Sequence, residues 1–521
     1  MKMLNHPQSR REFLADVGKG MITATIGCGL ASELGLATAH AEETRLEFGA
    51  LEPLVRLMQE TPAAKLMPVL VEKLRGGVEL RQLVAAGALA NARTFGGEDY
   101  VGFHTMMALA PGFHIAQELP TELQPLPVLK VLYRNTNRIQ ESGGGKTEVL
   151  HPVAASERPA GADAAAWLRE AVHSKDASRA DSAFAAVAGT PEDAFDALLH
   201  TVEDDTEVHR VVLPYRAWDL LGIIGNENAT TLLRQSVRYC VKAENWSRRE
   251  GTDQPQSLLP RMLEEHKLLG ATPGTRQPDD AWVEKLSDTI FRATPSQAAD
   301  AAAAALAEGF APDAIGEAIS LAANQLILRD HGRTPNAEIA GKPIGSVHGD
   351  SIGVHACDSA GAWRNLARVA RPRNTFACLI LGAYQVALDR TNRGGDFLNW
   401  EPLPFARFVE GAKATDAAGL LAELDAAIRG NLQASAAGIV QRYGQLGHEP
   451  RGAFDLLRRY AISEDGALHA EKFFRTCTEE FATTRPAFRW RQLCALARVT
   501  ASEYGRPAAG VAEAKQLLKV A

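Results

Sequence analysis

The stretch Ser346-Val-His348-Gly-Asp350-Ser-Ile-Gly353-Val-His355-Ala-Cys357-Asp358 places two imidazoles, two carboxylates and a thiol within thirteen residues. An echo of this stretch occurs earlier in the chain, in Gly102-Phe-His104 and then in Gly112-Phe-His114. Because histidines recur at matching places, the stretch predicts a chain that is built from two related halves.

Three further matches in the same order favour a duplication. Residues 74–88 resemble residues 306–320, and the triplet Thr136-Asn-Arg138 recurs as Thr391-Asn-Arg393. Ala194-Phe-Asp196 recurs as Ala453-Phe-Asp455, and each is followed by an acidic pair and a histidine. Two copies are too few for a solenoid, so we expect two halves that pack with pseudo-twofold symmetry.

Composition indicates an all-α protein. The 521 residues are 46% hydrophobic and only 6% aromatic. Alanine and leucine dominate the segments in which apolar residues recur at spacings of three and four, which is typical of amphipathic helices. The formal net charge of −7 makes a general nucleic-acid-binding function a poor fit.

The first 41 residues have the pattern of an export signal. Ser9-Arg10-Arg11-Glu12-Phe13-Leu14 resembles the twin-arginine motif, an apolar run follows at residues 21–36, and Ala39-His40-Ala41 fits a cleavage site. The sequence therefore predicts recognition by the twin-arginine translocation machinery and a periplasmic or secreted location. This route carries folded proteins, many of which already hold a cofactor.

Domain boundaries follow from the leader and from one polar, proline-containing segment. We expect a signal peptide at 1–41, a helical repeat at 42–244, a linker at 245–280 and a second helical repeat at 281–521. No later segment has the ~18 apolar residues of a membrane helix, so stable membrane insertion is not expected.

Five cysteines follow the leader, namely Cys240, Cys357, Cys378, Cys477 and Cys494. They contain no C-x-x-C pair, and their number is odd. The pattern is compatible with one or two bridges but not with a disulfide scaffold, and we expect most of these thiols to be buried as small apolar groups.

The histidines are the candidate functional residues. His348 and His355 are seven residues apart, so one helix would carry them on nearly the same face, two turns apart. Around a pseudo-twofold axis we expect a central site formed by four histidines, with His114 and His355 in support. The central four are His104, His209, His348 and His469. Pro111 is expected to interrupt a helix that would otherwise carry both His104 and His114.

Such a site predicts a transition metal, with iron, copper or zinc as candidates, because these metals accept imidazole ligands. Nearby carboxylates are candidates for metal ligands or for acceptors that orient an imidazole through its second nitrogen. The alternative is that they cap helices. The carboxylates are Glu203, Asp204, Asp350, Asp358 and Asp465.

A site without metal is a second hypothesis. His348, His355 and His469 are the candidate catalytic residues, and Lys472 provides a cation one turn after His469 that could stabilise an oxyanion. Cys357 is a candidate thiolate nucleophile, although residues two apart on a helix point away from each other. No Gly-x-Ser-x-Gly, His-Glu-x-x-His or dinucleotide-binding motif is present.

Three histidine-centred segments resemble the questin-oxidase-like family. They are His209-Arg-Val-Val-Leu-Pro-Tyr-Arg-Ala-Trp-Asp-Leu-Leu-Gly, Val354-His355-Ala-Cys-Asp-Ser-Ala-Gly-Ala-Trp and Leu468-His469-Ala-Glu-Lys472. The resemblance spans most of residues 50–505, but only as scattered motifs. It implies an oxygenase that acts on a ring-containing organic substrate. The export signal and the duplication depart from the family.

The sequence therefore predicts an exported oxidoreductase with a histidine-lined, metal-binding site between two helical halves, acting on a small organic substrate. The alternative is a metal-free helical binding or scaffold protein with structural histidines. A third hypothesis is metal-free hydrolysis.

Overall fold

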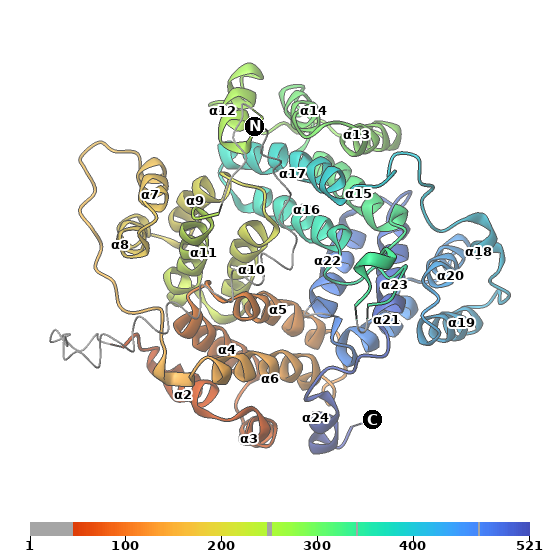
Figure 1. The fold of residues 1–521 in the computed structure, drawn as a ribbon, viewed down its shortest axis with the longest axis horizontal. Helices are drawn as coiled ribbons and strands as arrows, with labels where there is room; N and C mark the ends of the chain where they lie inside the picture. Colours follow the sequence, from red (N-terminus) through yellow and green to blue (C-terminus); the bar gives the residue numbers. More distant parts are fainter. Residues whose placement is uncertain (1–44, 247–252, 340–341, 467–468, 521) are drawn as a thin grey trace, which may run out of the picture. The chain divides into compact units, whose positions relative to one another are not determined.

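The computed structural model describes residues 45–246, 253–339, 342–466 and 469–520. The predicted signal peptide lies outside these ranges. Residues 47–521 form one compact unit, and its described residues contain α-helices, labelled α2 to α24 in Figure 1, and no β-strand. The prediction of an all-α protein is confirmed.

The helices of the first half are α2 (Glu52–Glu60), α3 (Ala63–Arg75), α4 (Leu80–Phe95), α5 (Tyr100–Gln117), α6 (Pro125–Glu141), α7 (Ala164–His173), α8 (Ala177–Val187), α9 (Pro191–Val202), α10 (Val208–Ile224) and α11 (Ala229–Ala243). Helix α12 (Pro255–Glu265) follows. The second half contains α13 (Asp280–Arg292), α14 (Pro295–Ala307), α15 (Pro312–Arg329), α16 (Ile352–Val369), α17 (Pro372–Arg393), α18 (Ala406–Glu410), α19 (Ala417–Arg429), α20 (Gln433–Gln445), α21 (Arg451–Ser463), α22 (Ala470–Thr483), α23 (Trp490–Glu503) and α24 (Val511–Leu518).

Local sequence accounts for the helix starts. Asp99 caps α5 by accepting a hydrogen bond from the Gly102 N–H, and Thr294 and Gln297 form a capping box at α14. Prolines occupy the first turn of α9, α14, α15 and α17, where no N–H is needed. Helix α5 also runs through Pro111, so the expected interruption between His104 and His114 is wrong.

The two halves have helices in matching order. Helices α3 and α14 both have 13 residues, and they end at the same distance before α4 and α15. In each of these links one glycine adopts a positive φ, +90° at Gly77 and +80° at Gly309. Such a φ favours glycine, so the same turn is encoded in both links.

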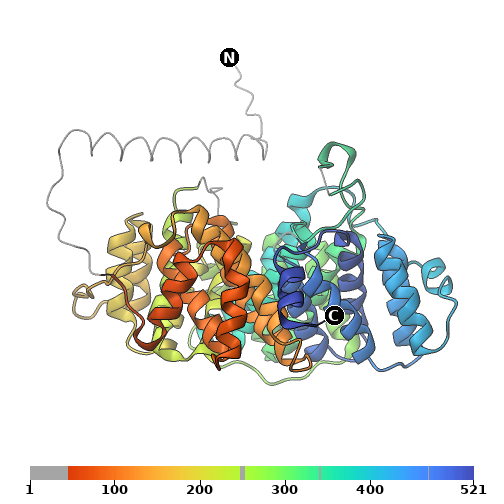
Figure 2. The same ribbon diagram turned by 90° about the horizontal axis from the view of Figure 1, so that it is seen from below.

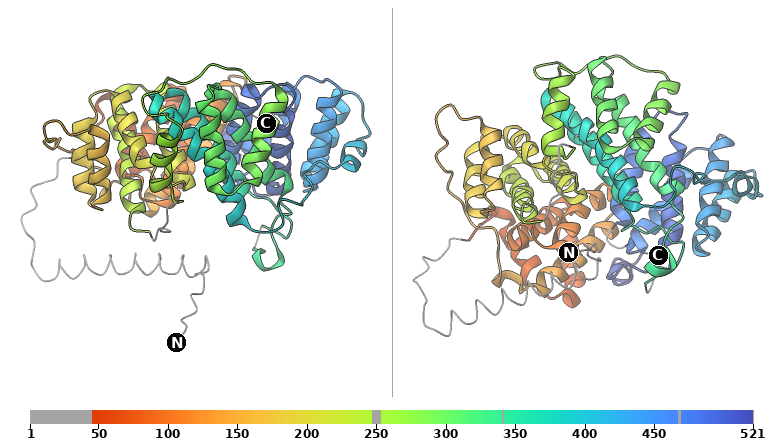
Figure 3. Two further views of the ribbon diagram at one scale, coloured as in Figure 1. Left: turned by 90° about the horizontal axis from the view of Figure 1, so that it is seen from above. Right: turned by 45° about the horizontal axis from the view of Figure 1, so that its top comes forward.

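Tertiary contacts match as well. Arg138 at the end of α6 forms a two-bond ion pair with Asp99 before α5, and Arg393 at the end of α17 does the same with Asp330 before α16. The halves meet where α5 packs against α22 and α10 against α16. Figure 1 shows these four helices at the centre, and Figures 2 and 3 show many helices of this unit standing side by side.

Residues 245–280, the predicted linker, include α12. Its side chains Leu258, Leu259, Met262 and Leu263 are buried, and the helix packs against α14 and α17. This segment is therefore part of the packed unit.

The five cysteines that follow the leader are free and buried, as expected for small apolar core residues. None of the helices in the described ranges combines the length and the apolar content that a membrane crossing needs.

Candidate functional site

Four imidazoles meet where the two halves join. His104 lies in the first turns of α5, and His209 lies at the start of α10. His355 lies in the first turn of α16, and His469 is the N-cap residue of α22. We refer to these four residues as the histidine cluster. His104, His209 and His469 are buried.

Within each half the two rings form a close pair. The Nε2 atoms of His104 and His209 are 3.2 Å apart, and those of His355 and His469 are 3.1 Å apart. Two nitrogens bound at ~2.0–2.1 Å to one tetrahedral ion lie about 3.3 Å apart. Each pair therefore has the spacing of two ligands of one metal ion.

The pairs also approach each other across the junction. The ring centroids of His104 and His469 are 5.3 Å apart, and those of His209 and His355 are 5.8 Å apart. Exchanging His104 for His355 and His209 for His469 maps each contact onto its partner, as expected for a pseudo-twofold arrangement. No three of the four rings bring their donor nitrogens within 4.8 Å of one another, so the nitrogens form two separate pairs.

Hydrogen bonds fix the tautomers of the first pair. His104 Nδ1 lies 2.7 Å from the Tyr100 carbonyl oxygen, and His209 Nδ1 lies 2.6 Å from Glu207 Oε1. Both oxygens accept hydrogen bonds, so Nδ1 carries the proton in each ring. The two Nε2 atoms then face each other, and this contact requires a proton or a metal ion between them.

Glu207 is held as an anion. It caps α10 by accepting hydrogen bonds from the backbone N–H groups of His209 and Arg210, and the Tyr239 hydroxyl donates to its Oε2 at 2.6 Å. Burial alone would raise the pKa of Glu207, but the His209 imidazole and these hydrogen bonds lower it to about 2. A carboxylate behind a metal-directed imidazole is a common second-shell arrangement.

The surroundings disfavour a proton on His104 and on His355. Burial lowers the pKa of His104 well below its usual value, and the nearby Lys472 ammonium lowers it further. Burial also lowers the pKa of His355 to about 3, with added repulsion from His209 and Lys472. These rings are therefore neutral at physiological pH, which is the state that binds metals.

Lys472 is the buried cation beside the cluster, one turn into α22. Burial lowers its pKa to about 8, although the carboxylates of Asp358 and Glu471 oppose this shift. Asp358 is itself buried and accepts a hydrogen bond from the Thr476 hydroxyl at 2.8 Å. Burial raises the pKa of Asp358.

His348 does not join the cluster, contrary to our expectation. Helix α16 begins only after the N-cap residue Ser351, so His348 lies in the preceding loop and does not share a helix face with His355. His348 is buried, and neither ring nitrogen has a hydrogen-bond partner among the residues that the structure describes. The next residue, Gly349, has room only for hydrogen, because a Cβ there would lie 2.6 Å from His469 Cβ. This loop therefore packs against His469.

His355, expected in a supporting position, is instead the counterpart of His104. A Cβ on Gly102 would collide with Phe95 of α4, and a Cβ on Gly353 would collide with Ile327 of α15. In both halves the histidine follows this close-packed glycine by two residues. The shared Gly-x-His pattern sets the register of the two sites.

His114 lies outside the cluster as well. It is near the end of α5, and its Nε2 pairs with Asp219 of α10 at 2.9 Å. About a quarter of its side chain is exposed, 27%. His114 is therefore a partner of Asp219 and has no contact that links it to the other rings.

The acids that we singled out have other partners. Asp350 pairs with Arg333 and Lys342, Glu203 pairs with Arg373, and Asp465 pairs with Arg134. None of the five caps α10, because Glu207 holds that position. Its spacing of two residues before His209 was the signal in the sequence that could have identified it.

The thiol of Cys357 is a poor nucleophile here. It is buried, and burial raises its pKa well above the usual value, with neighbouring carboxylates adding to the shift. A thiolate is the reactive form, so this environment opposes the cysteine hypothesis.

A second group of potential ligands lies within the first half. His173, Asp204 and Glu244 have donor atoms within 4.8 Å of one another. Asp204 already pairs with Arg169 at 2.8 Å, and Glu244 pairs with Arg210 at 3.3 Å. Two guanidinium groups compensate these carboxylates, so the group is a weak candidate for a cation site.

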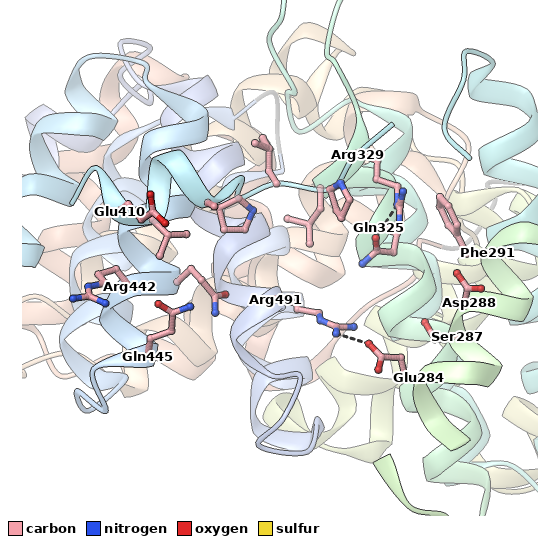
Figure 4. A pocket seen from close by; sticks show the side chains of 17 residues that line it. Glu284, Ser287, Asp288, Phe291, Gln325, Arg329, Glu410, Arg442, Gln445 and Arg491 are labelled. Carbon is pink, nitrogen blue, oxygen red and sulfur yellow. Dashed lines mark hydrogen bonds and ion pairs between the residues drawn. The ribbon is translucent and has the colours of Figure 1, made fainter. Parts of the chain in front are cut away.

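One cavity of about 730 Å³ lies in the second half, away from the cluster (Figure 4). Its wall includes Phe291, Leu328 and Pro404, with Arg442 and the ion pair of Arg491 and Glu284 among its polar groups. No histidine is among its lining residues. It therefore provides space for a ligand but no metal-binding group of the imidazole type.

Comparison with protein-family models, curated proteins and solved structures finds no match to this chain. The resemblance to questin-oxidase-like proteins stays a prediction, and functional inference depends on the geometry of the cluster.

Proposed function

We propose that the chain is an exported metal-dependent oxidoreductase whose histidine cluster binds transition-metal ions, one at each pair, and acts on a small organic substrate. The observation that carries the proposal is the 3.2 Å approach of the His104 and His209 Nε2 atoms, with both Nδ1 positions committed to oxygen acceptors. Imidazole nitrogens with these properties suit copper, iron or zinc, and copper or iron would supply redox chemistry.

The proposal includes two predictions from the sequence. The chain is a duplication, which the matching helices, glycines and ion pairs of the two halves support. It is exported to the periplasm or beyond the cell, because residues 9–14 have the twin-arginine pattern. Detection of the unprocessed full chain only in the cytoplasmic fraction would refute export.

Each group has a distinct part in this proposal. The four imidazoles hold metal, Glu207 fixes the His209 tautomer and increases its basicity, and Lys472 supplies a positive charge beside the site. Burial excludes bulk water from the rings and strengthens these electrostatic interactions.

Metal analysis of protein purified without a histidine tag tests the proposal. We expect two copper or iron ions for each chain, and His104→Ala and His355→Ala should each weaken binding by more than about a hundredfold, because loss of a supporting group alone costs 10–100-fold. His114→Ala is the matched control. His114 also lies on α5, one of the helices that form the junction, but its ring pairs with Asp219.

The result distinguishes three arrangements. One ion that is lost in both variants would show that the four rings share a single site, and zinc alone would remove the redox part of the proposal. Fewer than about 0.1 ions for each chain, after reconstitution with copper, iron and zinc in turn, would overturn metal binding and favour a scaffold with structural histidines.

A further inference from the structure

A cavity of about 410 Å³ lies beside the histidine cluster at the junction of the halves. The first half contributes residues of α5 and α6, among them Ala108 and Lys130. The second half contributes residues of α22, of the segment before it and of the segment after α23, among them Glu471 and Arg506. Residues of both halves are therefore needed to form the wall of this cavity.

The cavity is close to the metal-binding rings. Ala108 lies one turn after His104 on the same face of α5, and Glu471 lies two residues after His469. The guanidinium of Arg134, which also lines the cavity, is near enough to Lys472 to lower the pKa of that lysine. Lys472 in turn faces His104 and His355.

One cation on the cavity wall has no ion-pair partner among the lining residues. Lys130 pairs with Glu471 at 2.6 Å, and Arg134 pairs with Asp465. In contrast, the guanidinium of Arg506 has no hydrogen bond or ion pair within the described ranges, and its charge acts on the buried carboxyl group of Glu503. Its charge is felt by His348, the buried imidazole with no partner on either nitrogen.

The rest of the wall combines polar and apolar groups, and Thr105 and Asn137 are its polar members. Val131 and Tyr133 face the cavity from α6, and Pro507 and Ala508 face it from the segment after α23. A pocket of this volume, with one guanidinium outside any ion pair and a partly apolar wall, suits a compact organic molecule with a single negative charge.

The equivalent place in the other half is filled. Lys130 lies six residues before Thr136, and the residue six before Thr391 is Gln385. Gln385 accepts a hydrogen bond from the buried Trp363 indole at 2.7 Å and donates one to Ser359. In the second half, the Trp363 indole and the Gln385 amide therefore fill the place of the charged cavity wall. The matching position in the first half, at Lys130, borders an open, charged pocket.

We propose that this cavity binds a small organic monoanion, a carboxylate or phenolate with a flat apolar body, and that Arg506 holds its charged end. As a substrate pocket the site rests on the proposed function, but binding of the anion does not, because the contacts come from α5, α6 and Arg506.

Isothermal titration of the mature protein with benzoate tests the inference, with benzamide as the neutral probe of the same shape. We expect benzoate to bind at least about tenfold more tightly than benzamide. Arg506→Gln should weaken benzoate binding at least about tenfold and leave benzamide unchanged. Arg442→Gln is the matched control, because Arg442 also has an uncompensated guanidinium but lines the other cavity.

A second variant and a metal-free sample separate the outcomes. Ala509→Leu narrows the same cavity from an exposed position and should weaken both probes. Equal binding of the two probes, or wild-type benzoate binding by folded Arg506→Gln protein, overturns the inference. The same titration after chelation distinguishes the two proposals: benzoate binding that persists in protein unable to take up metal supports the pocket and removes only the metal site.

Discussion

The two histidine pairs share a frame but differ in the charge placed next to them. In the first half Glu207 lies two residues before His209 and accepts its Nδ1–H. At that spacing the second half has Ala467 in its sequence, and it adds Lys472 three residues after His469, where the first half has Val212. The same geometry is therefore combined with an anion in one half and a cation in the other.

This difference predicts unequal metal affinities. A carboxylate behind an imidazole stabilises a bound cation, whereas a buried ammonium opposes it. Lys472 acts on one ring of each pair, so Glu207 distinguishes the pairs, and the first pair should load at lower metal concentration. Changes at Glu207, at Lys472 and at the pair Arg138 and Arg393 test this comparison.

Replacing Glu207 by Gln has the largest expected effect. The amide keeps the shape of the side chain but loses the charge that supports His209, so affinity at the first pair should fall 10- to 100-fold. A competition titration with a chromophoric chelator measures this loss. The second pair should keep its affinity.

Glu244→Gln is the control for this change. Glu244 is another largely buried carboxylate that contacts α10, but it pairs with Arg210 at 3.3 Å and not with an imidazole. If both variants bind metal as the wild type does, Glu207 is only a helix cap and the comparison between the pairs loses its basis.

Sequence patterns predicted the helical class, and they brought together His104, His209 and His469 from distant segments. They failed at the fourth ring because the link between α15 and α16 is much longer than the link between α4 and α5. Matching histidines by order placed His348 opposite His104. Matching the close-packed glycines, Gly102 and Gly353, gives His355 instead. The long loop before α16 shifts the positions of histidines relative to the rest of the repeat. It does not change which glycine must contact the preceding helix.

The charges around the cluster were harder to predict. Glu207 was overlooked because the acidic pair Glu203-Asp204 matches the second half and Glu207 does not. Its effect depends on the Tyr239 hydroxyl of α11, a contact that local spacing does not reveal. A comparison of the halves that considers only matching residues therefore misses residues such as Glu207, which occur in one half alone.

Replacing Lys472 by Met has an intermediate expected effect. Removal of the ammonium ends its repulsion of His104 and His355, so metal affinity at pH 7 should rise about tenfold. In the wild type the same gain should appear as pH rises past about 8, where Lys472 loses its proton. Metal titrations at pH 7 and pH 9 measure both effects, and a wild-type affinity with the same pH dependence as Lys472→Met would contradict this role.

Protein stability gives an independent reading of Lys472. Its folded pKa of about 8 lies below the usual 10.5, so between these values the unfolded chain binds more protons than the folded chain. The free energy of unfolding should therefore rise with pH in this window by up to about 1.4 kcal/mol per pH unit, relative to Lys472→Met. Urea titrations of metal-free protein at pH 8 and pH 10 measure this difference.

The smallest expected effect is a difference between two variants that the proposed duplication makes equivalent. Arg138 and Arg393 each form two hydrogen bonds to a carboxylate, at 2.9 and 2.6 Å to Asp99 and at 3.1 and 2.7 Å to Asp330. Both arginines are about a quarter exposed, 26% and 23%. Solvent therefore reduces each contribution, and Arg138→Ala and Arg393→Ala should each lower the free energy of unfolding by about 1.5 kcal/mol.

The two losses should agree within about 0.5 kcal/mol, because matching geometry and matching exposure leave little to distinguish the ion pairs. Arg292→Ala, which breaks an exposed pair with Asp288, should cost less than either. Metal content should stay at the wild-type value in all three. Losses that differ by more than about 2 kcal/mol would mean that the two ion pairs do different work. The two halves would then have diverged in general, and the difference in charge between the histidine pairs could not be interpreted by itself.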